Sequence, residues 1–348
     1  MAKRAFLLGG TGQTGRALVP RLAERGWDVT VASRGERPVL PEVGNRARLV
    51  QIDRGDGEAL RTAVADGFDV LVDFVAFETS HANQLLDLAG TVGSLIVLSS
   101  ASVYADAHGR TLDEASGPDD YPQLRIPIVE GERTIEPGDA TYSTKKAAIE
   151  RTLLDQDSLP ATVVRPGAIH GPGTSFSREW YFAKRALDRR RCVVLADRGR
   201  SRFHTTSTEN LAELLRLAAE RPATRVLNCG DPAALPVVEI GRAISAAMEW
   251  EWTEALLPDP PLDGRPGMTP WSAARPFVLD MTEAEIVLGY APVTDYATAV
   301  GPTCEWLTRE TANRDWREVL PGSARYMADD FDYEAEDELI AALAVKDG

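Results

Sequence analysis

A tyrosine and a lysine stand four residues apart in TYSTKKAAIE, residues 141–150. The residues that follow, STKKAAIERTLL, read as a helix, so Tyr142 and Lys146 project from one face of it. A phenol, with an ordinary pKa of about 10, is a poor acid or base at neutral pH unless a nearby cation stabilises its phenolate. Lys146 can supply that charge. The pair therefore predicts a proton donor and the cation that tunes it.

A hydroxyl that orients the same reacting oxygen would complete such a site. SSASVY, residues 99–104, offers one at the end of a predicted strand, where open parallel sheets bind ligands. We predict that Ser100, Tyr142 and Lys146 are the catalytic residues, with Ser99 as the alternative serine.

A glycine loop, GGTGQTG at residues 9–15, follows the first predicted strand and opens the first predicted helix. Glycines let the backbone approach a pyrophosphate, whose charge is met by amide groups at the helix start. We predict cofactor contacts at Gly9, Gly12, Gln13, Thr14 and Gly15. With the Lys146 ammonium on the nicotinamide ribose, the predicted chemistry is hydride transfer coupled to proton transfer at a carbonyl oxygen.

The second predicted strand ends in Ser33 and Arg34, with Arg37 close behind, and has no carboxylate at its tip. An arginine there suits the 2'-phosphate of NADP, whereas an acidic residue would suit NAD. We therefore expect NADP, with NAD less favoured, although Arg34 could be an ordinary exposed arginine.

Three further residues complete the predicted cofactor set: Asp53, Arg54 and Pro166. Asp53 ends the third predicted strand, where its carboxylate could accept a hydrogen bond from the adenine amino group or could cap a turn.

GGTGQTG, LSSASVY and YSTKK occur in this order, and with them the sequence resembles the extended, epimerase/dehydratase-like branch of the short-chain dehydrogenase/reductase superfamily. DVLVDFVA, RPGAIHGPG and VLNCGD extend the resemblance over about residues 3–310. The resemblance implies that Ser100 positions the reacting oxygen, that Tyr142 is the acid/base residue, and that Lys146 binds ribose and tunes the tyrosine.

The chain also departs from that family. Ser100-Ala101-Ser102 replaces the Thr-Asp-Glu triplet of the dehydratases, which argues against sugar dehydration. Asp73-Phe74-Val75-Ala76 and Ala168 replace residues usual in nucleotide-sugar epimerases. We expect an NADP(H)-dependent oxidoreductase acting on a small metabolite, with an epimerase or a non-catalytic dinucleotide-sensing or RNA-associated protein as alternatives.

Three substrate contacts are predicted: Phe77, His170 and Arg202. The segment 178–204 mixes aromatic residues with arginines, which would suit an anionic or aromatic substrate. Its KRALDRRR stretch could equally be the charged face of an amphipathic helix. His170 could be an ordinary loop histidine, and no second histidine stands at metal-ligand spacing.

Short aliphatic runs alternate with helix-like segments, which predicts a Rossmann-type doubly wound α/β sheet with a smaller C-terminal α/β substrate lobe. The predicted strands are residues 4–9, 28–33, 47–53, 69–75, 94–100, 161–165 and 224–230. We assign residues 1–165 and about 205–230 to the dinucleotide-binding domain, and about 166–204 and 231–320 to the substrate lobe. Residues 321–348, with the acidic run DDFDYEAEDE, are expected to be a solvated tail or a helix end.

The 348 residues carry a net charge of -15, which disfavours a nucleic-acid partner because binding a phosphate backbone needs clustered cations. Cys192, Cys229 and Cys304 lie far apart and fit small buried residues of a reducing compartment. The apolar run near the N-terminus is too short for a signal peptide, and no window is long enough for a membrane span. We expect a cytoplasmic protein that acts on a small-molecule substrate and can form a homodimer.

Overall fold

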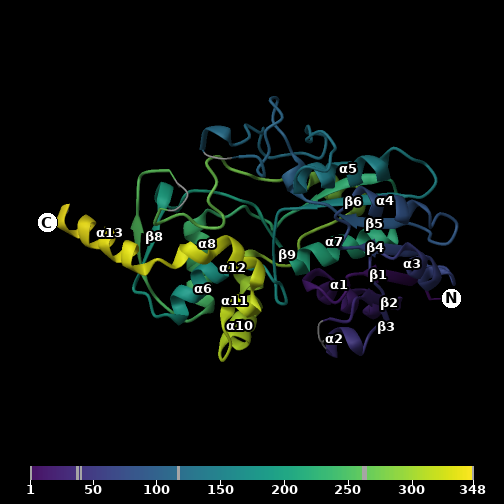
Figure 1. Ribbon diagram of the computed structural model, residues 1–348, viewed down its shortest axis with the longest axis horizontal. Coiled ribbons are helices and arrows are strands. Elements are labelled where there is room, and N and C mark those ends of the chain that lie inside the picture. Colours follow the sequence, from purple (N-terminus) through teal and green to yellow (C-terminus); the bar gives the residue numbers. More distant parts are fainter. Residues whose placement is uncertain (1, 37–38, 40, 116–117, 261–264, 347–348) are drawn as a thin grey trace.

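The computed structural model describes residues 2–36, 39, 41–115, 118–260 and 265–346. Its main sheet has seven parallel strands in the order β10-β6-β5-β4-β1-β2-β3 (Figure 1). The strands are β1 (Arg4–Leu8), β2 (Asp28–Ser33), β3 (Arg48–Gln51), β4 (Val70–Asp73), β5 (Leu95–Leu98), β6 (Ala161–Pro166) and β10 (Arg225–Cys229). The predicted doubly wound fold is confirmed, and each strand end lies within two residues of its predicted place. The strand order reverses beside β1, which is where such sheets bind ligands.

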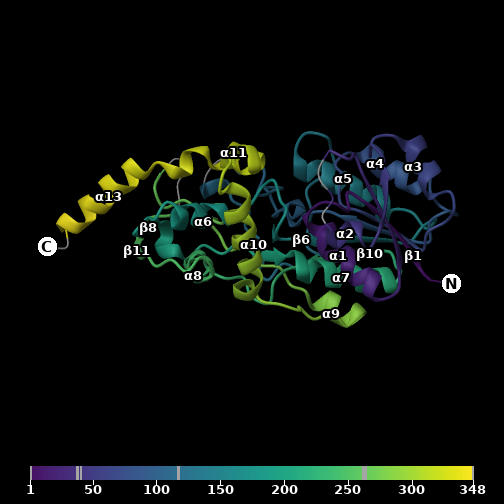
Figure 2. The same cartoon turned by 90° about the horizontal axis from the view of Figure 1, so that it is seen from below.

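Helices cover both faces of this sheet (Figures 1 and 2). Leu18 and Leu22, like Leu211 and Leu215, are buried against the sheet because residues four apart share one helix face. One face carries α1 (Gln13–Glu24), α2 (Pro41–Gly44), α7 (Thr208–Glu220) and α9 (Thr282–Leu288), and the other carries α3 (Gly57–Val64), α4 (Thr79–Leu86) and α5 (Tyr142–Leu154).

The second lobe has its own apolar core, built around Trp180, Phe182, Ile240 and Trp271. Its helices are α6 (Trp180–Leu187), α8 (Val237–Ala247), α10 (Tyr296–Thr311), α11 (Trp316–Val319), α12 (Pro321–Met327) and α13 (Tyr333–Lys346). Two short parallel sheets pair β7 (Ala168–His170) with β9 (Thr205–Ser207) and β8 (Cys192–Leu195) with β11 (Thr253–Leu256). Short 3-10 turns are η1 (Ala101–Val103), η2 (Pro118–Asp120), η3 (Ala196–Gly199) and η4 (Ala328–Phe331).

The structure differs from the predicted domain division at two places. Ala284 and Leu288 of α9, assigned to the substrate lobe, pack into the core of the main sheet. Residues 321–346 are not a solvated tail but form α12, η4 and α13, in line with the helix-end alternative for the acidic run, and Glu336 is buried in an ion pair with Arg185 of α6. The acidic run and the basic stretch of the sequence therefore neutralise each other.

Cys229 and Cys304 are buried, as predicted, and Cys192 is half-buried. None of the helices in the described ranges is both long enough and apolar enough to span a membrane.

Candidate active site

Tyr142 is the first residue of α5, and the start of this helix is well defined. The Thr141 side chain accepts a hydrogen bond from the Thr144 N–H, and the Thr144 hydroxyl accepts one from the Thr141 N–H. This reciprocal cap holds the helix start, and with it Tyr142, at the carboxyl end of the sheet.

The phenol of Tyr142 faces a cavity of about 1240 Å³, and 45% of the residue remains exposed. Ser100, which follows β5, lines the same cavity as Tyr142. Desolvation by the cavity walls raises the pKa of Tyr142 to about 12, and the hydrogen bond with Ser100 opposes that rise. At neutral pH Tyr142 is therefore a phenol with a proton to donate.

Lys146, one turn further along α5, is 2% exposed. Its ammonium donates hydrogen bonds to the carbonyl oxygens of Ala76 at 2.7 Å and Leu98 at 2.9 Å. Burial lowers the pKa of Lys146 to about 8, against the charges of Asp73 and Glu150. The group thus stays mostly protonated at neutral pH and keeps one N–H for a further acceptor.

That Lys146 tunes the pKa of Tyr142 stays a prediction. The Lys146 Nζ atom lies 5.6 Å from the centre of the Tyr142 ring and is bonded to backbone carbonyls. After burial and the Ser100 hydrogen bond, the charges that act on the pKa of Tyr142 are those of Asp113, which raises it, and Arg178, which lowers it.

Of the two candidate serines, Ser99 has a hydroxyl that is hydrogen-bonded inside the protein. Its hydroxyl donates to Glu150 Oε1 at 2.5 Å, and Glu150 forms a buried ion pair with Arg165 at 2.5 Å. Ser100 instead accepts a hydrogen bond from the Ser102 N–H at 3.1 Å and lines the cavity together with Tyr142. This arrangement favours Ser100 as the orienting hydroxyl.

The glycine loop fits a dinucleotide. A side chain on Gly15 would overlap the Gly10 carbonyl, and Gly9 has a φ of +77°, so the loop is shaped by residues without side chains. The N–H groups of Gln13 and Thr14 begin α1 and have no acceptor within the helix. Gln13 lines the cavity, and its Oε1 is buried without a partner. These groups, with Gly12 as the helix cap, can hold a pyrophosphate.

Three of the remaining predicted cofactor contacts, Ser33, Arg34 and Pro166, lie at or next to the ends of strands. Ser33 ends β2, and the exposed Arg34 after it forms an ion pair with Glu36 at 2.9 Å, while Arg37 lies outside the described residues. Pro166 ends β6 and lines the cavity beside Gly167.

Asp53 and Arg54 follow β3. Asp53 Oδ1 caps a turn by accepting the Gly55 N–H at 2.8 Å, so its adenine contact stays a prediction. The Arg54 guanidinium is buried in an ion pair with Asp73 at 2.7 Å and also bonds Gln84, so its side chain is engaged within the protein and its cofactor contact stays a prediction.

Phe77 lies beside the catalytic pair. Its ring centre is 4.6 Å from Lys146 Nζ and 6.5 Å from the Tyr142 ring centre. Phe77 thus covers the ammonium, but the cavity lining does not include it.

The prediction for His170 is wrong: its ring is 1% exposed and bonds Asp231 Oδ2 at 2.9 Å. Burial alone would lower the pKa of His170, but the hydrogen bond with Asp231 raises it above the ordinary value. The Arg202 side chain also lies away from the cavity and bonds the Ala234 carbonyl at 3.4 Å. Successive residues of an extended segment face opposite sides, so its neighbour Phe203 lines the cavity instead.

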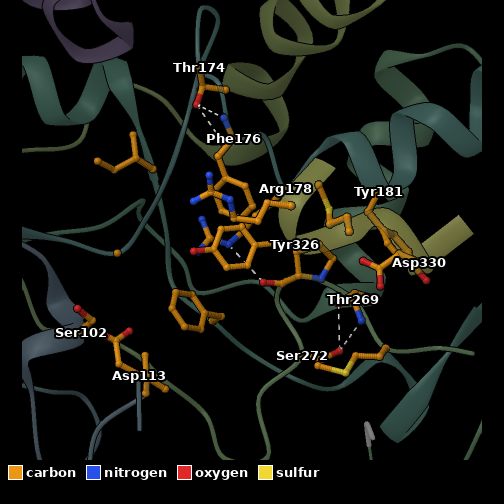
Figure 3. Close-up of a pocket in the computed structure, with 18 of the residues that line it drawn as sticks. Ser102, Asp113, Thr174, Phe176, Arg178, Tyr181, Thr269, Ser272, Tyr326 and Asp330 are labelled. Atoms are coloured by element: carbon orange, nitrogen blue, oxygen red, sulfur yellow. Dashed lines mark hydrogen bonds between the residues drawn. The ribbon is translucent and has the colours of Figure 1, made fainter. Parts of the chain in front are cut away.

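Two functional candidates were missed in the sequence. Asp113 accepts hydrogen bonds from the Ser143 N–H at 2.8 Å and the Ser143 hydroxyl at 2.7 Å, beside Tyr142. Arg178 enters the cavity from the opposite wall (Figure 3). The arginine-rich segment 178–204 was the available signal for Arg178, and the loop around Asp113 carried none. Across the described ranges, no group of three or more His, Cys, Asp or Glu residues is placed to hold a metal ion.

A glycine loop at the point of strand reversal, with a serine, tyrosine and lysine at the same edge, defines a dinucleotide-dependent protein of the extended short-chain dehydrogenase/reductase class. The chain belongs to the NAD dependent epimerase/dehydratase family, whose model matches residues 5–230.

Two curated relatives match part of the chain. It is 28% identical over 225 residues to 2'-dehydrokanamycin reductase of Streptomyces kanamyceticus, covering 61% of this chain and 58% of that protein. It is 25% identical over 194 residues to the chloroplast stem-loop binding protein of 41 kDa b of Arabidopsis thaliana, covering 52% and 46%. The chain thus spans about half the length of these relatives.

Solved structures show the same fold. UDP-glucose 4-epimerase of Thermotoga maritima, with UDP-glucose, has a TM-score of 0.67 at 17% identity and covers 89% of this chain and 100% of its own. UDP-glucuronic acid 4-epimerase of Bacillus cereus, in complex with UDP-glucuronic acid and NAD, has a TM-score of 0.64 at 15% identity and covers 88% and 99%.

Proposed function

We propose that this protein is an NADP(H)-dependent oxidoreductase that transfers a hydride to or from a carbonyl or secondary alcohol of a small metabolite. The observation that supports this proposal most strongly is that Tyr142 and Ser100 line one large cavity, which also reaches Gln13 of the glycine loop. A substrate carbonyl in that cavity can therefore meet a proton donor next to a dinucleotide site.

In the reductive direction, Ser100 and Tyr142 both hydrogen-bond the substrate carbonyl oxygen and hold it in place. When bound, the reduced nicotinamide supplies the hydride that the carbonyl carbon accepts. The oxygen gains negative charge, and Tyr142 gives it the phenolic proton, so that an alcohol is formed. Lys146 donates two of its three N–H groups to backbone carbonyls and would donate the third to a ribose hydroxyl of the bound cofactor. The reverse reaction uses the same groups, with Tyr142 as a base.

The test is a panel of aldehydes and ketones incubated with NADPH or NADH, followed by the loss of reduced-cofactor absorbance and by mass spectrometry of the alcohol. The expected result is cofactor oxidation matched by alcohol formation. The runner-up function is that of an epimerase, as in the structural neighbours named above, and it would interconvert stereoisomers with no net cofactor oxidation. Absence of any dinucleotide binding would refute both functions.

The preference for NADP is supported by Arg34, whose side chain is 63% exposed just after β2. Its ion pair with Glu36 neutralises part of its positive charge. We expect Arg34→Ala to raise the KM for NADPH by about 10-fold and to leave the KM for NADH unchanged. The reason is that a hydrogen bond to a charged group contributes about 1.5–3 kcal/mol. Initial-rate kinetics with both cofactors measure this. Arg46→Ala, which removes another exposed arginine paired with a glutamate, is the matched control. Equal changes for the two cofactors would count against NADP.

A further inference from the structure

Arg178 stands on the cavity wall just before α6, and its contacts leave most of its hydrogen-bonding capacity unused. Its Nε donates to the Pro270 carbonyl at 3.3 Å. Its guanidinium lies 4.8 Å from the Phe176 ring centre and 5.6 Å from that of Phe203. A guanidinium carries five N–H donors, so two planar NH₂ groups remain for a ligand.

Within the part of the chain that the structure describes, Arg178 forms no ion pair, and neither do Arg265 and Arg325, which line the same cavity. A cation held in a partly closed cavity without a carboxylate partner is costly unless a ligand anion completes it. Arg178 is half-buried whereas Arg265 and Arg325 are exposed, so Arg178 is the arginine of this cavity that would gain most from binding an anion.

The carboxylates of the cavity are engaged elsewhere. Asp113 is bonded to Ser143, and Glu336 is paired with Arg185. Figure 3 shows Asp330 beside Tyr181, whereas Arg178 groups with Phe176 and Tyr326. Asp332, which also lines the cavity, accepts the Ala335 N–H. The negative charge that acts on Arg178 is that of the neighbouring Glu179, whose carboxylate accepts hydrogen bonds from the Ser177 and Tyr296 hydroxyls.

Aromatic rings frame this arginine on more than one side. Tyr326 of α12 meets the Phe176 ring edge-on, with 5.4 Å between ring centres, and Phe203 stacks on Phe277 at 5.3 Å. Such surfaces pack against flat or apolar parts of a ligand while the guanidinium holds its charged end. Arg178 and Tyr142 line the same cavity, so one ligand can reach both of them.

We propose that the substrate of this cavity is an anion, a carboxylate or phosphate carried on an aromatic or otherwise flat apolar scaffold, and that Arg178 binds the charged group with both of its NH₂ groups. This inference rests on the proposed function for the part of the ligand that reacts at Tyr142. Arg265 and Arg325 add positive charge at the same cavity. A planar guanidinium fits both carboxylate and phosphate oxygens in a two-pronged contact, which a lysine does not.

Binding is tested first, without turnover, by calorimetry with three ring compounds of matched shape: benzoate, phenyl phosphate and benzyl alcohol. Wild-type protein is expected to bind one or both anions at least 10-fold more tightly than benzyl alcohol, and the stronger anion identifies the charged group. Arg178→Ala is expected to lose about 10-fold in anion affinity and to bind benzyl alcohol unchanged. Arg178→Lys should recover part of the loss.

Two control variants separate Arg178 from general charge effects. Arg200→Ala removes an exposed arginine that is paired with Asp197 outside the cavity, and it is expected to bind all three compounds as wild type does. Arg202→Ala removes the arginine predicted from the sequence and is also expected to behave as wild type. The proposal is overturned if Arg178→Ala keeps wild-type anion affinity, if Arg202→Ala loses it instead, or if Arg178→Ala loses benzyl alcohol binding equally.

Turnover then distinguishes this inference from the proposed function. With NADPH, 4-carboxybenzaldehyde is expected to show a KM at least 10-fold below that of 4-(hydroxymethyl)benzaldehyde, and Arg178→Ala should remove the difference. Arg178-dependent anion binding without any cofactor oxidation would refute the oxidoreductase and leave the anion site standing. Reduction of both aldehydes with equal KM would refute the anion site and leave the oxidoreductase standing.

Discussion

Tyr142→Phe is expected to lower kcat for carbonyl reduction by about 10²- to 10⁴-fold, the usual contribution of a positioned acid or base. The change removes one oxygen atom from a ring that is already accommodated at the helix start, so the fold and the cofactor KM should be preserved. Steady-state kinetics on the best aldehyde of the panel, with the cofactor Kd measured by fluorescence, would show the two quantities separately.

The matched control is Tyr290→Phe, which removes a phenolic hydroxyl that is buried in the core of the main sheet, outside the cavity. It should leave kcat within a few-fold of wild type. Full activity of Tyr142→Phe would show that the proton comes from another group, and the mechanism proposed for Ser100, Tyr142 and Lys146 would fall.

The second large effect concerns stability. Glu150→Ala is expected to reduce the free energy of unfolding by about 3–5 kcal/mol, because removing one partner of a buried ion pair leaves the other charge uncompensated. The Glu150 and Arg165 side chains are at most 5% exposed. The substitution also removes the acceptor of the Ser99 hydroxyl. Urea unfolding at neutral pH, followed by tryptophan fluorescence, measures the change.

Glu36→Ala is the control, because both side chains of the Arg34–Glu36 pair are more than 60% exposed. Such surface pairs contribute about 0–1 kcal/mol to the free energy of unfolding. A joint replacement, Glu150→Leu with Arg165→Met, should recover much of the loss by removing both charges. If Glu150→Ala were no more destabilising than Glu36→Ala, the buried pair would not have the energetic role given to it here.

The sheet and its glycine loop could be predicted because both are encoded locally. Each strand is a short aliphatic run with clear ends, and GGTGQTG joins such a run to a helical pattern. Parallel strands place their carboxyl ends at one edge, so Ser100 and the start of α5 could be expected to meet there before any distance was known.

The arginines could not be assigned in the same way. Arg54, Arg178 and Arg202 are alike in sequence, yet one is buried against Asp73, one faces the cavity and one bonds a backbone carbonyl. Their roles depend on partners 19 to 92 residues away, which local pattern does not reveal. His170 was misread for the same reason, since Asp231 lies 61 residues further on.

Part of the cavity wall is formed by α12 and the start of α13, which lie near the C-terminal end of the sequence. The family model ends at residue 230, whereas Tyr326 and Phe331 line the cavity, and the Arg185–Glu336 ion pair fastens this segment to α6. Mutations in the last thirty or so residues can therefore change which molecules are accepted without disturbing the glycine loop or the Tyr142 helix. Part of the cavity that selects a ligand is thus encoded apart from the segments that carry the glycine loop and the Tyr142 helix.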